Sequence, residues 1–406
     1  MPVSKTIAKQ LENASWIRRM FEEGVRLKRE RGADAICDFS LGNPDVEPPP
    51  AVLDALRRVA AGNRSGSHGY MPNPGYPQVR EAVAKKLQRE TGLDFTAEDI
   101  FMTVGSAGAC NVILKSILDP GDEVIVLMPC FSEYRFYIAN HNGCMVPVET
   151  DATFLPVAER IAAAITPRTR AIILNTPNNP TGKVFTRSEL EFIRDLCVRW
   201  NAFCITDEIY EHILYDGTEH ITMARIDGMR DRTIVINGMS KTYSVTGWRV
   251  GWAIAPPEAT ASIRKVHDFL TVGAAAPLQQ AGATALKQPQ SYYDKLATSY
   301  AEKRARLLKI LTQAGFTVFK PRGAYYIMTD ISRFPDPDPK RFPAATRDVR
   351  FSKYLVEEIG VATVPGSSFY NDPNDGATQI RFTFCKKEET LAAAEQRLAK
   401  LKLATL

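Results

Sequence analysis

Residues 236–252 read Ile-Asn-Gly-Met-Ser-Lys-Thr-Tyr-Ser-Val-Thr-Gly-Trp-Arg-Val-Gly-Trp, and this stretch decides how the chain folds. Its one lysine, Lys241, follows the apolar run 233–236, which is typical of a buried strand. Burial disfavours a charged amine, so it lowers the pKa of the lysine and makes it a nucleophile or Schiff-base former. Arg249 follows eight residues later, and a guanidinium is well suited to a phosphate. The stretch therefore predicts a reactive lysine beside an anion site.

Strand-like and helical patterns alternate from residue 99 to residue 256, a range that includes this stretch. The strands are continuous apolar runs, which favour a mainly parallel sheet covered on both faces by helices. Thr186 and Glu189 form a capping box that predicts the start of a helix reaching Trp200. The C-terminal third mixes helices with alternating strands, and this pattern predicts a smaller α+β domain.

A small-residue loop, Gly105-Ser-Ala-Gly108, lies between a predicted strand at 99–104 and a predicted helix that reaches Leu118. In this arrangement free N–H groups and the positive end of the helix point at a phosphate. Small residues also occur at ordinary strand-to-helix turns, so the interpretation of this loop as a phosphate site depends on the presence of Lys241 and Arg249. It makes Ser106 and Ala107 candidates for binding a phosphate.

Two charged residues occupy apolar strands where their burial needs a reason. Asp207 ends the predicted strand that begins at Phe203, and a buried carboxylate requires a partner such as a pyridinium N–H. A helix cap is the alternative for this residue. Arg381 lies inside the apolar run 379–384, where a guanidinium favours a carboxylate that it can bind with two hydrogen bonds. A structural salt bridge is the alternative there.

Two motifs together resemble the class I/II aminotransferases, which carry pyridoxal phosphate (PLP). One is Gly238-Met-Ser-Lys241 followed by Gly247-Trp-Arg249-Val-Gly251, and the other is Asn-x-Pro-Asn-Asn-Pro-Thr-Gly at 175–182. The resemblance covers roughly residues 30–400. It implies an α/β enzyme of fold-type I, similar to aspartate aminotransferase, with a mainly parallel seven-stranded-type sheet. The implied domains are a large PLP-binding domain at 46–290 and a small α+β domain formed by 1–45 and 291–406.

The resemblance also assigns roles to individual residues. It implies that Phe131 stacks on the cofactor ring, where the family often has Trp or Tyr, and that Tyr70 reaches the cofactor phosphate of a neighbouring subunit. A homodimer with shared active sites is therefore expected. The implied sites are catalytic Lys241, Asp207 and Tyr210; cofactor contacts at Tyr70, Ser106, Ala107, Phe131, Asn179, Asp207, Tyr210, Ser240, Lys241 and Arg249; and substrate contacts at Gly42, Asn179 and Arg381.

Composition excludes several other classes of function. The net charge is +5 without an aromatic-interleaved basic stripe, so nucleic acid is not an expected partner. The densest basic run, 18–31, also contains glutamates and is interpreted as the solvated face of a helix expected over 5–31. The seven cysteines are scattered without a C-x-x-C pair, which predicts a reducing compartment without structural zinc. No signal core or 18-residue apolar run occurs, so a cytoplasmic protein without a membrane segment is expected.

The function implied is transfer of an amino group between an L-amino acid and a 2-oxoacid, with ping-pong kinetics through Lys241. Glutamate and 2-oxoglutarate are expected as one pair, with aspartate or a broad or aromatic range as the other donor. A PLP-dependent β-lyase or decarboxylase is the alternative enzyme. A PLP-sensing transcription regulator is disfavoured, because only about 30 residues precede the match, too few for a winged helix. The sequence does not decide which residues bind the substrate side chain. The candidates are Arg26, Arg135, Arg322, Tyr70, Phe131, Tyr134 and Tyr325.

Overall fold

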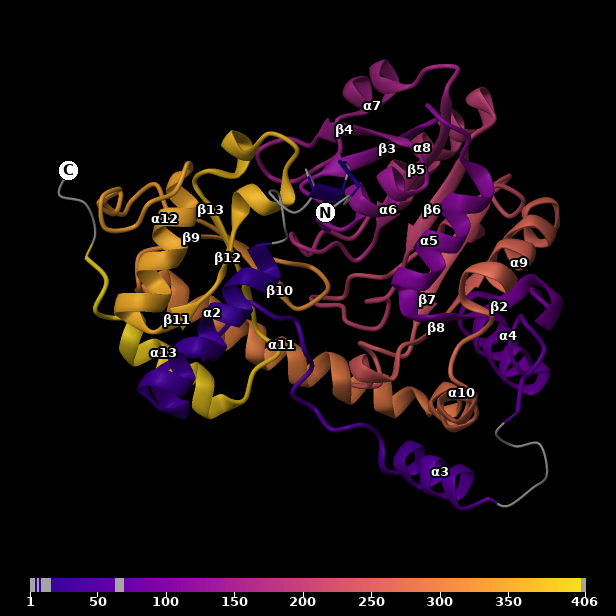
Figure 1. The fold of residues 1–406 in the computed structure, drawn as a ribbon, viewed down its shortest axis with the longest axis horizontal. Helices are drawn as coiled ribbons and strands as arrows, with labels where there is room; N and C mark the ends of the chain where they lie inside the picture. Colours follow the sequence, from indigo (N-terminus) through magenta and orange to yellow (C-terminus); the bar gives the residue numbers. More distant parts are fainter. Residues whose placement is uncertain (1–3, 6, 9–15, 63–68, 403–406) are drawn as a thin grey trace.

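The computed structural model describes residues 4–5, 7–8, 16–62 and 69–402, and these form two lobes that each contain a β-sheet (Figure 1). Most of the predicted N-terminal helix before Trp16 lies outside the described residues. The described part is helix α2 (Trp16–Arg31), and Gly32 follows it with φ of 105°. This left-handed conformation suits glycine and ends the helix where the sequence predicts.

The larger lobe is built on a seven-stranded sheet with the order β2-β8-β7-β6-β5-β3-β4. Strands β4, β3, β5, β6 and β7 run parallel, whereas β8 is antiparallel to both of its neighbours. The predicted mainly parallel sheet of seven strands is thus confirmed. The strands are β2 (Ile100–Val104), β3 (Glu123–Met128), β4 (Cys144–Glu149), β5 (Thr169–Asn175), β6 (Phe203–Asp207), β7 (Thr233–Gly238) and β8 (Val250–Ile254).

Helices cover both faces of this sheet, because successive side chains of a strand point to opposite sides. In β3, Val124 and Val126 belong to one apolar cluster, whereas Ile125 and Leu127 belong to another. Both faces are therefore core, as the continuous apolar runs predict. The first face is covered by α5 (Gly105–Ile117), α6 (Tyr134–Asn140) and α9 (Pro257–Thr271), and the second by α7 (Ala158–Ala164) and α8 (Arg187–Trp200).

The smaller lobe contains a four-stranded antiparallel sheet with the order β12-β13-β10-β9. A second, two-stranded parallel sheet joins β1 to β11 and so brings the two ends of the chain together. Both sheets and their helices fit the predicted α+β lobe. The elements are β1 (Cys37–Asp38), β9 (Thr317–Phe319), β10 (Tyr326–Asp330), β11 (Val361–Ala362), β12 (Val364–Pro365), β13 (Gln379–Thr383), α12 (Arg347–Tyr354) and α13 (Glu388–Leu398).

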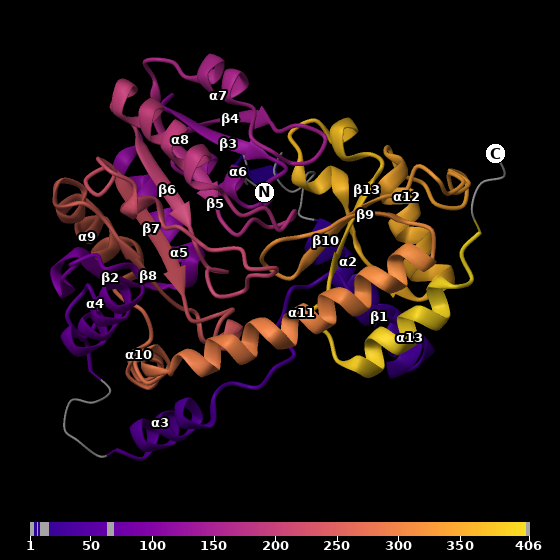
Figure 2. The ribbon, with the colours of Figure 1, turned by 180° about the vertical axis from the view of Figure 1, so that it is seen from behind.

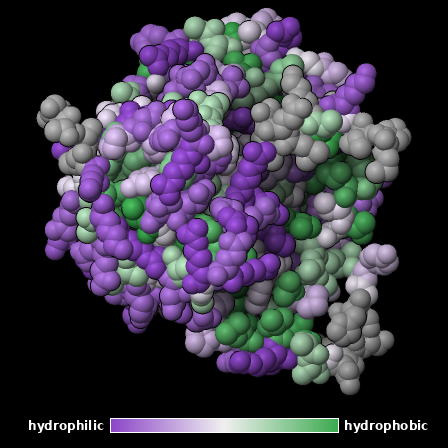
Figure 3. Space-filling view, turned by 60° about the vertical axis from the view of Figure 1, so that its left-hand side comes forward, coloured by the Kyte–Doolittle hydropathy of each residue, from purple (hydrophilic) through white to green (hydrophobic). Residues whose placement is uncertain are grey.

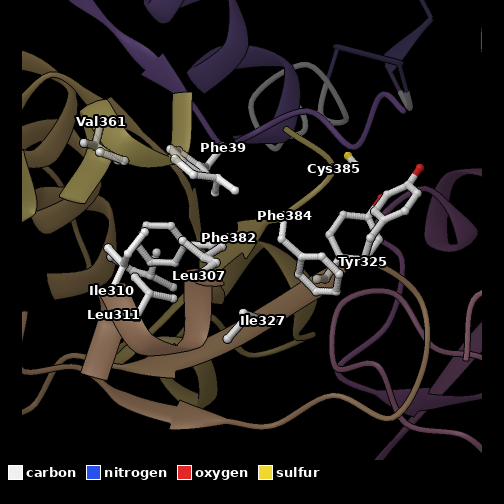
Figure 4. Close-up of a cluster of buried hydrophobic side chains, with 14 of the residues drawn as sticks. Phe39, Leu307, Ile310, Leu311, Tyr325, Ile327, Val361, Phe382, Phe384 and Cys385 are labelled. Atoms are coloured by element: carbon white, nitrogen blue, oxygen red, sulfur yellow. The ribbon is translucent and has the colours of Figure 1, made fainter. Parts of the chain in front are cut away.

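Helix α11 (Gln290–Gln313) runs beneath both lobes and joins them (Figure 2). Its C-terminal half supplies Leu307, Ile310 and Leu311 to the core of the smaller lobe (Figure 4). Phe39, from the N-terminal part of the chain, packs in the same core. The N-terminal arm therefore belongs to the smaller lobe in space. The domain boundaries themselves, at 45/46 and 290/291, stay a prediction.

The remaining helices lie at the β2 edge of the larger sheet: α4 (Pro77–Thr91) packs on β2, and α3 (Pro50–Ala61) packs on α10 (Ala276–Gly282). Hydrophilic side chains dominate one face of the molecule, with apolar side chains gathered along its lower edge (Figure 3). Within the described ranges, no helix combines the length and the apolar character needed to cross a membrane.

A buried group of charges ties α4 to the turn that follows β6. Lys86 is 1% exposed, and its ammonium contacts Glu90 at 2.6 Å and Glu211 at 2.7 Å. The imidazole of His212 lies 3.3 Å from Glu90. Burial opposes ionisation of Glu90, but the nearby imidazole of His212 and the charge of Lys86 lower its pKa to about 2. The lysine therefore neutralises carboxylates that are largely withdrawn from water.

Replacing Lys86 by methionine is expected to lower the free energy of unfolding by about 3 kcal/mol at pH 7, because two carboxylates lose their cation. The lowered folded-state pKa of Glu90 means that its ionised form stabilises the fold above about pH 4.5, and that this contribution is lost as the pH falls towards 2. The difference in free energy of unfolding between Lys86→Met and the unsubstituted protein should therefore become smaller below pH 4.5. Urea unfolding of both proteins at pH 7 and below pH 4.5 measures this difference. Lys85→Met, at an exposed neighbour, should leave stability unchanged.

Candidate active site

A cavity of about 470 Å³ lies where the carboxyl ends of the central strands of the larger sheet face the smaller lobe. Open α/β sheets bind ligands at this edge. Residues from both lobes line the cavity, including β13 and the segment after β1. The structure brings together all of the sequence-predicted site residues except Tyr70: Gly42, Ser106, Ala107, Phe131, Asn179, Asp207, Tyr210, Ser240, Lys241, Arg249 and Arg381.

Lys241 follows the end of β7 and points its amine into this cavity. The Nζ atom donates a hydrogen bond to the carbonyl of Gly42 at 3.0 Å. Burial lowers the pKa of Lys241 to about 8, and the charges of Arg249 and Arg381 act in the same direction. An amine with this pKa is available as a base near neutral pH, as its place after an apolar strand suggests.

The start of α5 forms a cradle for an anion next to the lysine. Gly105 has φ of 66°, and a Cβ atom there would lie 2.6 Å from Nη2 of Arg249. A glycine is thus needed both for the backbone conformation and for the approach of the guanidinium. The Oγ atom of Ser106 is buried and has no hydrogen-bond partner among the described residues. An unpaired hydroxyl, a guanidinium and a helix N-terminus together fit a phosphate.

Asp207 ends β6 and lies 7% exposed beside the cavity. Burial raises the pKa of its carboxyl to about 6, against hydrogen bonds from the Tyr134 hydroxyl at 2.8 Å and the Ile209 N–H at 3.4 Å. In the part of the chain that the structure describes, no lysine or arginine forms an ion pair with it. A cationic N–H from a ligand such as a pyridinium would supply this missing partner.

Arg381 is 1% exposed in β13. Its guanidinium donates to Asn179 Oδ1 at 2.8 Å and to the Ser40 carbonyl at 2.6 Å. The rings of Tyr326 and Phe369 flank it at 4.3 Å and 5.0 Å from Cζ. Within the described ranges no acidic side chain pairs with it, so the alternative of a structural salt bridge is not supported. Arg381 lines the cavity, and its Nε atom has no hydrogen-bond partner among the described residues, so the guanidinium still has a donor for an external carboxylate.

The remaining predicted residues divide into those near the cavity centre and one outside it. Tyr210 lies in the turn after β6, and its hydroxyl is 2.9 Å from the hydroxyl of Tyr326. Phe131 packs edge-on against Tyr134, with ring centroids 5.5 Å apart. Tyr70 is 97% exposed and does not line the cavity. Within one chain, it therefore contributes nothing to this site.

None of the arginines considered for the substrate side chain lines the cavity. Arg26 pairs with two glutamates on α2, Arg135 donates to the carbonyl of Tyr370, and Arg322 lines a separate hollow. Arg18 lines the cavity instead. Arg18 is exposed, which fits the interpretation of the basic run 18–31 as a solvated face, and it lines the cavity because that face of α2 lies over it.

Sequence reasoning also missed the positions of Tyr134 and Tyr326. Tyr134 was considered only for a substrate pocket, yet its hydroxyl binds Asp207, which lies 73 residues away along the chain. Tyr326 lines the cavity from β10. Neither contact leaves a signal in a single sequence, because both depend on how separate elements pack.

Known proteins resemble this chain in sequence and in fold. A sequence profile described as aminotransferase class I and II matches residues 34–398. Aspartate aminotransferase from Thermus thermophilus, solved with maleate, superimposes with a TM-score of 0.87 at 34% identity, over 98% of this chain and 99% of that one. N-Succinyldiaminopimelate aminotransferase from Mycobacterium tuberculosis gives 0.87 at 33% identity, also over 98% and 99%. Kynurenine–oxoglutarate transaminase of Dictyostelium discoideum is 35% identical over 392 residues, covering 89% of each chain.

The chain belongs to the aminotransferase class I and II family. Its fold is that of the aspartate aminotransferase-like, fold-type I enzymes, and its activity is that of a transaminase.

Proposed function

We propose that this enzyme uses PLP to transfer the amino group of an L-amino acid to a 2-oxoacid, with glutamate and 2-oxoglutarate as one of its pairs. The observation that carries the proposal is the position of the Lys241 amine, which lies in one cavity with Asp207 and Arg381. A carboxylate held by Arg381 and a ring nitrogen held by Asp207 would leave the reacting carbon beside that amine. No observation favours the β-lyase or decarboxylase alternative.

Each part of PLP has a matching group in the cavity. Ser106, Ala107, Ser240 and Arg249 would hold the phosphate, and Phe131 would stack on the ring. Asp207 would hold the proton on the ring nitrogen. The phenolic oxygen would accept hydrogen bonds from the other two predicted residues, Asn179 and Tyr210. The buried, unpaired hydroxyl of Ser106 and the raised pKa of Asp207 both support such an occupant.

When bound, PLP supplies a carbonyl that bonds to amines and a ring that accepts electrons released at Cα. Arg381 would bind the substrate carboxylate, and the Lys241 amine would anchor the cofactor through its carbonyl. The same Lys241 amine would remove the Cα proton as a base and return a proton as an acid. Its pKa of about 8 allows it to serve in both forms near neutral pH. Two successive half-reactions give ping-pong kinetics.

For the substrate side chain we propose a mixed subsite that takes aspartate as well as aromatic donors. Arg18 supplies a cation at the cavity wall, while Ile17, Phe21 and Leu41 supply apolar surface beside it. The two relatives of known structure are named for substrates with a second carboxylate, and the third for an aromatic amino acid. These names support both kinds of donor.

Arg18→Ala is expected to raise KM for aspartate by about tenfold, because one charge-assisted hydrogen bond to the second carboxylate is lost. The KM for phenylalanine should change less than twofold, since this substrate has no second carboxylate. Steady-state kinetics with aspartate and with phenylalanine measures, for each donor, the ratio of the KM of the variant to that of the unsubstituted enzyme. Arg29→Ala, on the same helix but outside the cavity wall, serves as the control. Equal losses for both donors in Arg18→Ala would contradict a carboxylate-binding role.

We also propose a cytoplasmic homodimer with shared active sites. The almost complete exposure of Tyr70 and its distance from the cavity support a role in a second copy. All seven cysteines are free, which supports a reducing compartment. Light scattering of the purified protein tests the dimer, and a monomer with full activity would contradict shared sites.

The experiment that tests the function is an absorbance spectrum of the PLP-loaded protein during addition of single amino acids. A visible band that is lost with aspartate and returns with 2-oxoglutarate is the expected result, because each half-reaction converts the cofactor. Release of ammonia or carbon dioxide without return of the band would instead establish the lyase or decarboxylase reaction.

A further inference from the structure

Tyr326 touches both the cofactor side and the carboxylate side of the cavity. It lies in β10 of the smaller lobe and is 3% exposed. Its hydroxyl is 2.9 Å from the hydroxyl of Tyr210, which belongs to the larger lobe. The face of its ring lies 4.3 Å from Cζ of Arg381. One side chain thus contacts a proposed cofactor ligand through its oxygen and the proposed substrate ligand through its ring.

The backbone near Tyr326 is shaped around its hydroxyl. A Cβ atom at Gly42 would lie 2.1 Å from the Tyr326 oxygen, so no larger residue fits there without moving it. The carbonyl of Gly42 accepts hydrogen bonds from Lys241 at 3.0 Å and from the Tyr325 hydroxyl at 2.8 Å. The Tyr326 hydroxyl is therefore held close to the reactive lysine, with Tyr210 as its hydrogen-bond partner.

The direction of the hydrogen bond between the two tyrosines follows from counting protons. A phenol has one proton to donate and can also accept. If Tyr210 donates to the cofactor's phenolic oxygen, its proton is used, and its contact with Tyr326 is satisfied only when Tyr326 is the donor. A hydroxyl that accepts a hydrogen bond becomes a stronger donor in turn.

We propose that Tyr326 is a positioning residue. Its hydroxyl donates a hydrogen bond to Tyr210 and so orients and strengthens the hydrogen bond from Tyr210 to the cofactor. Its ring packs against the guanidinium of Arg381 and keeps that group in its orientation. This inference rests on the proposed PLP function. The two roles reside in different atoms of one side chain, so they are separable. Removing the hydroxyl should affect the cofactor, and the stacking on Arg381 should persist.

The test is a pH titration of the visible absorbance band of the PLP-loaded enzyme. In Tyr326→Phe the midpoint is expected to rise by about 0.5 pH unit, roughly a threefold change in proton affinity. The sign follows because a weaker donor stabilises the phenolic anion less, and the Lys241 nitrogen then keeps its proton to higher pH. The KM for the amino-acid donor should stay within twofold, because the ring still flanks Arg381.

Tyr215→Phe is the matched control. It removes another buried tyrosine hydroxyl, which donates to the carbonyl of Ala324 at 2.6 Å and does not line the cavity. Its midpoint should equal that of the unsubstituted enzyme. In a Tyr210→Phe background, Tyr326→Phe should add no further shift, because the residue through which it acts is absent. An equal shift with and without Tyr210 would overturn the inference.

A third change should shift the titration midpoint in the opposite direction. It also keeps the inference testable if Tyr326→Phe folds poorly. Placing 3-fluorotyrosine at position 326 keeps the shape of the side chain but makes its hydroxyl a stronger donor, so the midpoint should fall. If the unsubstituted enzyme titrates normally and the midpoint does not shift in the position-326 variants, this inference alone is overturned. An unsubstituted enzyme that takes up no PLP or does not transaminate overturns the proposed function and this inference with it.

Discussion

Lys241→Ala should lose transamination activity by at least about 10⁴-fold, because in the proposed mechanism a single amine serves as the bond to the cofactor and as the acid and base at Cα. The effect is large because the structure offers no substitute: among the described residues, Lys241 is the only lysine that lines the cavity. Its neighbours there, Arg249 and Arg381, carry guanidinium groups, which do not serve as bases near neutral pH.

Borohydride treatment followed by mass analysis measures this prediction independently of activity. The unsubstituted enzyme should retain PLP covalently on Lys241, and Lys241→Ala should not retain it. Lys115→Ala, at an exposed position on α5, is the matched control and should behave like the unsubstituted enzyme. Covalent retention of PLP by Lys241→Ala would show that another residue carries the cofactor.

Asp207→Asn should lower kcat by about 10²- to 10³-fold and change KM little. The amide keeps the size of the side chain and still accepts the hydrogen bond from Tyr134. It lacks the negative charge that, in the proposed mechanism, holds a proton on the ring nitrogen of PLP, so the ring would accept electrons poorly. Single-turnover rates with aspartate measure the loss directly, because they report the chemical half-reaction.

Glu208→Gln is the control for this substitution, since Glu208 is the adjacent buried acid. Its carboxylate binds His220 and Thr222 at 2.9 Å and 2.8 Å and does not line the cavity. Its single-turnover rate should stay within about threefold of the unsubstituted enzyme, with thermal unfolding as the check on folding. A comparably small loss in Asp207→Asn would mean that the charge of Asp207 is not needed for the reaction.

The features that the sequence predicts well are those determined by neighbouring residues. The continuous apolar strands predict the parallel sheet, and Thr186 with Glu189 predicts the start of α8, where both halves of the capping box form. The meeting of Lys241 and Asp207 in one cavity is also predictable, because each follows or ends a strand, and the ends of parallel strands meet at one edge.

The features that the sequence does not predict are contacts between distant elements. The first turn of α2 reads as a charged helix, and only packing places Arg18 over the cavity. Residues 333–348 are rich in proline and charge, a composition typical of an exposed loop, yet Phe334 and Phe342 within them are 2% and 3% exposed. Their rings pack against aromatic rings of α12. A polar, proline-rich composition identifies the loop but does not reveal which of its aromatic rings are buried.

Segments near both ends of the chain pair with each other in the smaller lobe, and this pairing has a consequence for synthesis on the ribosome. Ser40 accepts its hydrogen bond from Arg381, 341 residues later, and β1 pairs with β11. The larger sheet is complete once residue 254 has emerged, so the cradle for the anion and the Lys241 segment can form early. The proposed contact between Arg381 and the substrate carboxylate must wait until β13, the last strand, is made. A nascent chain would therefore form its proposed cofactor site well before its proposed substrate site.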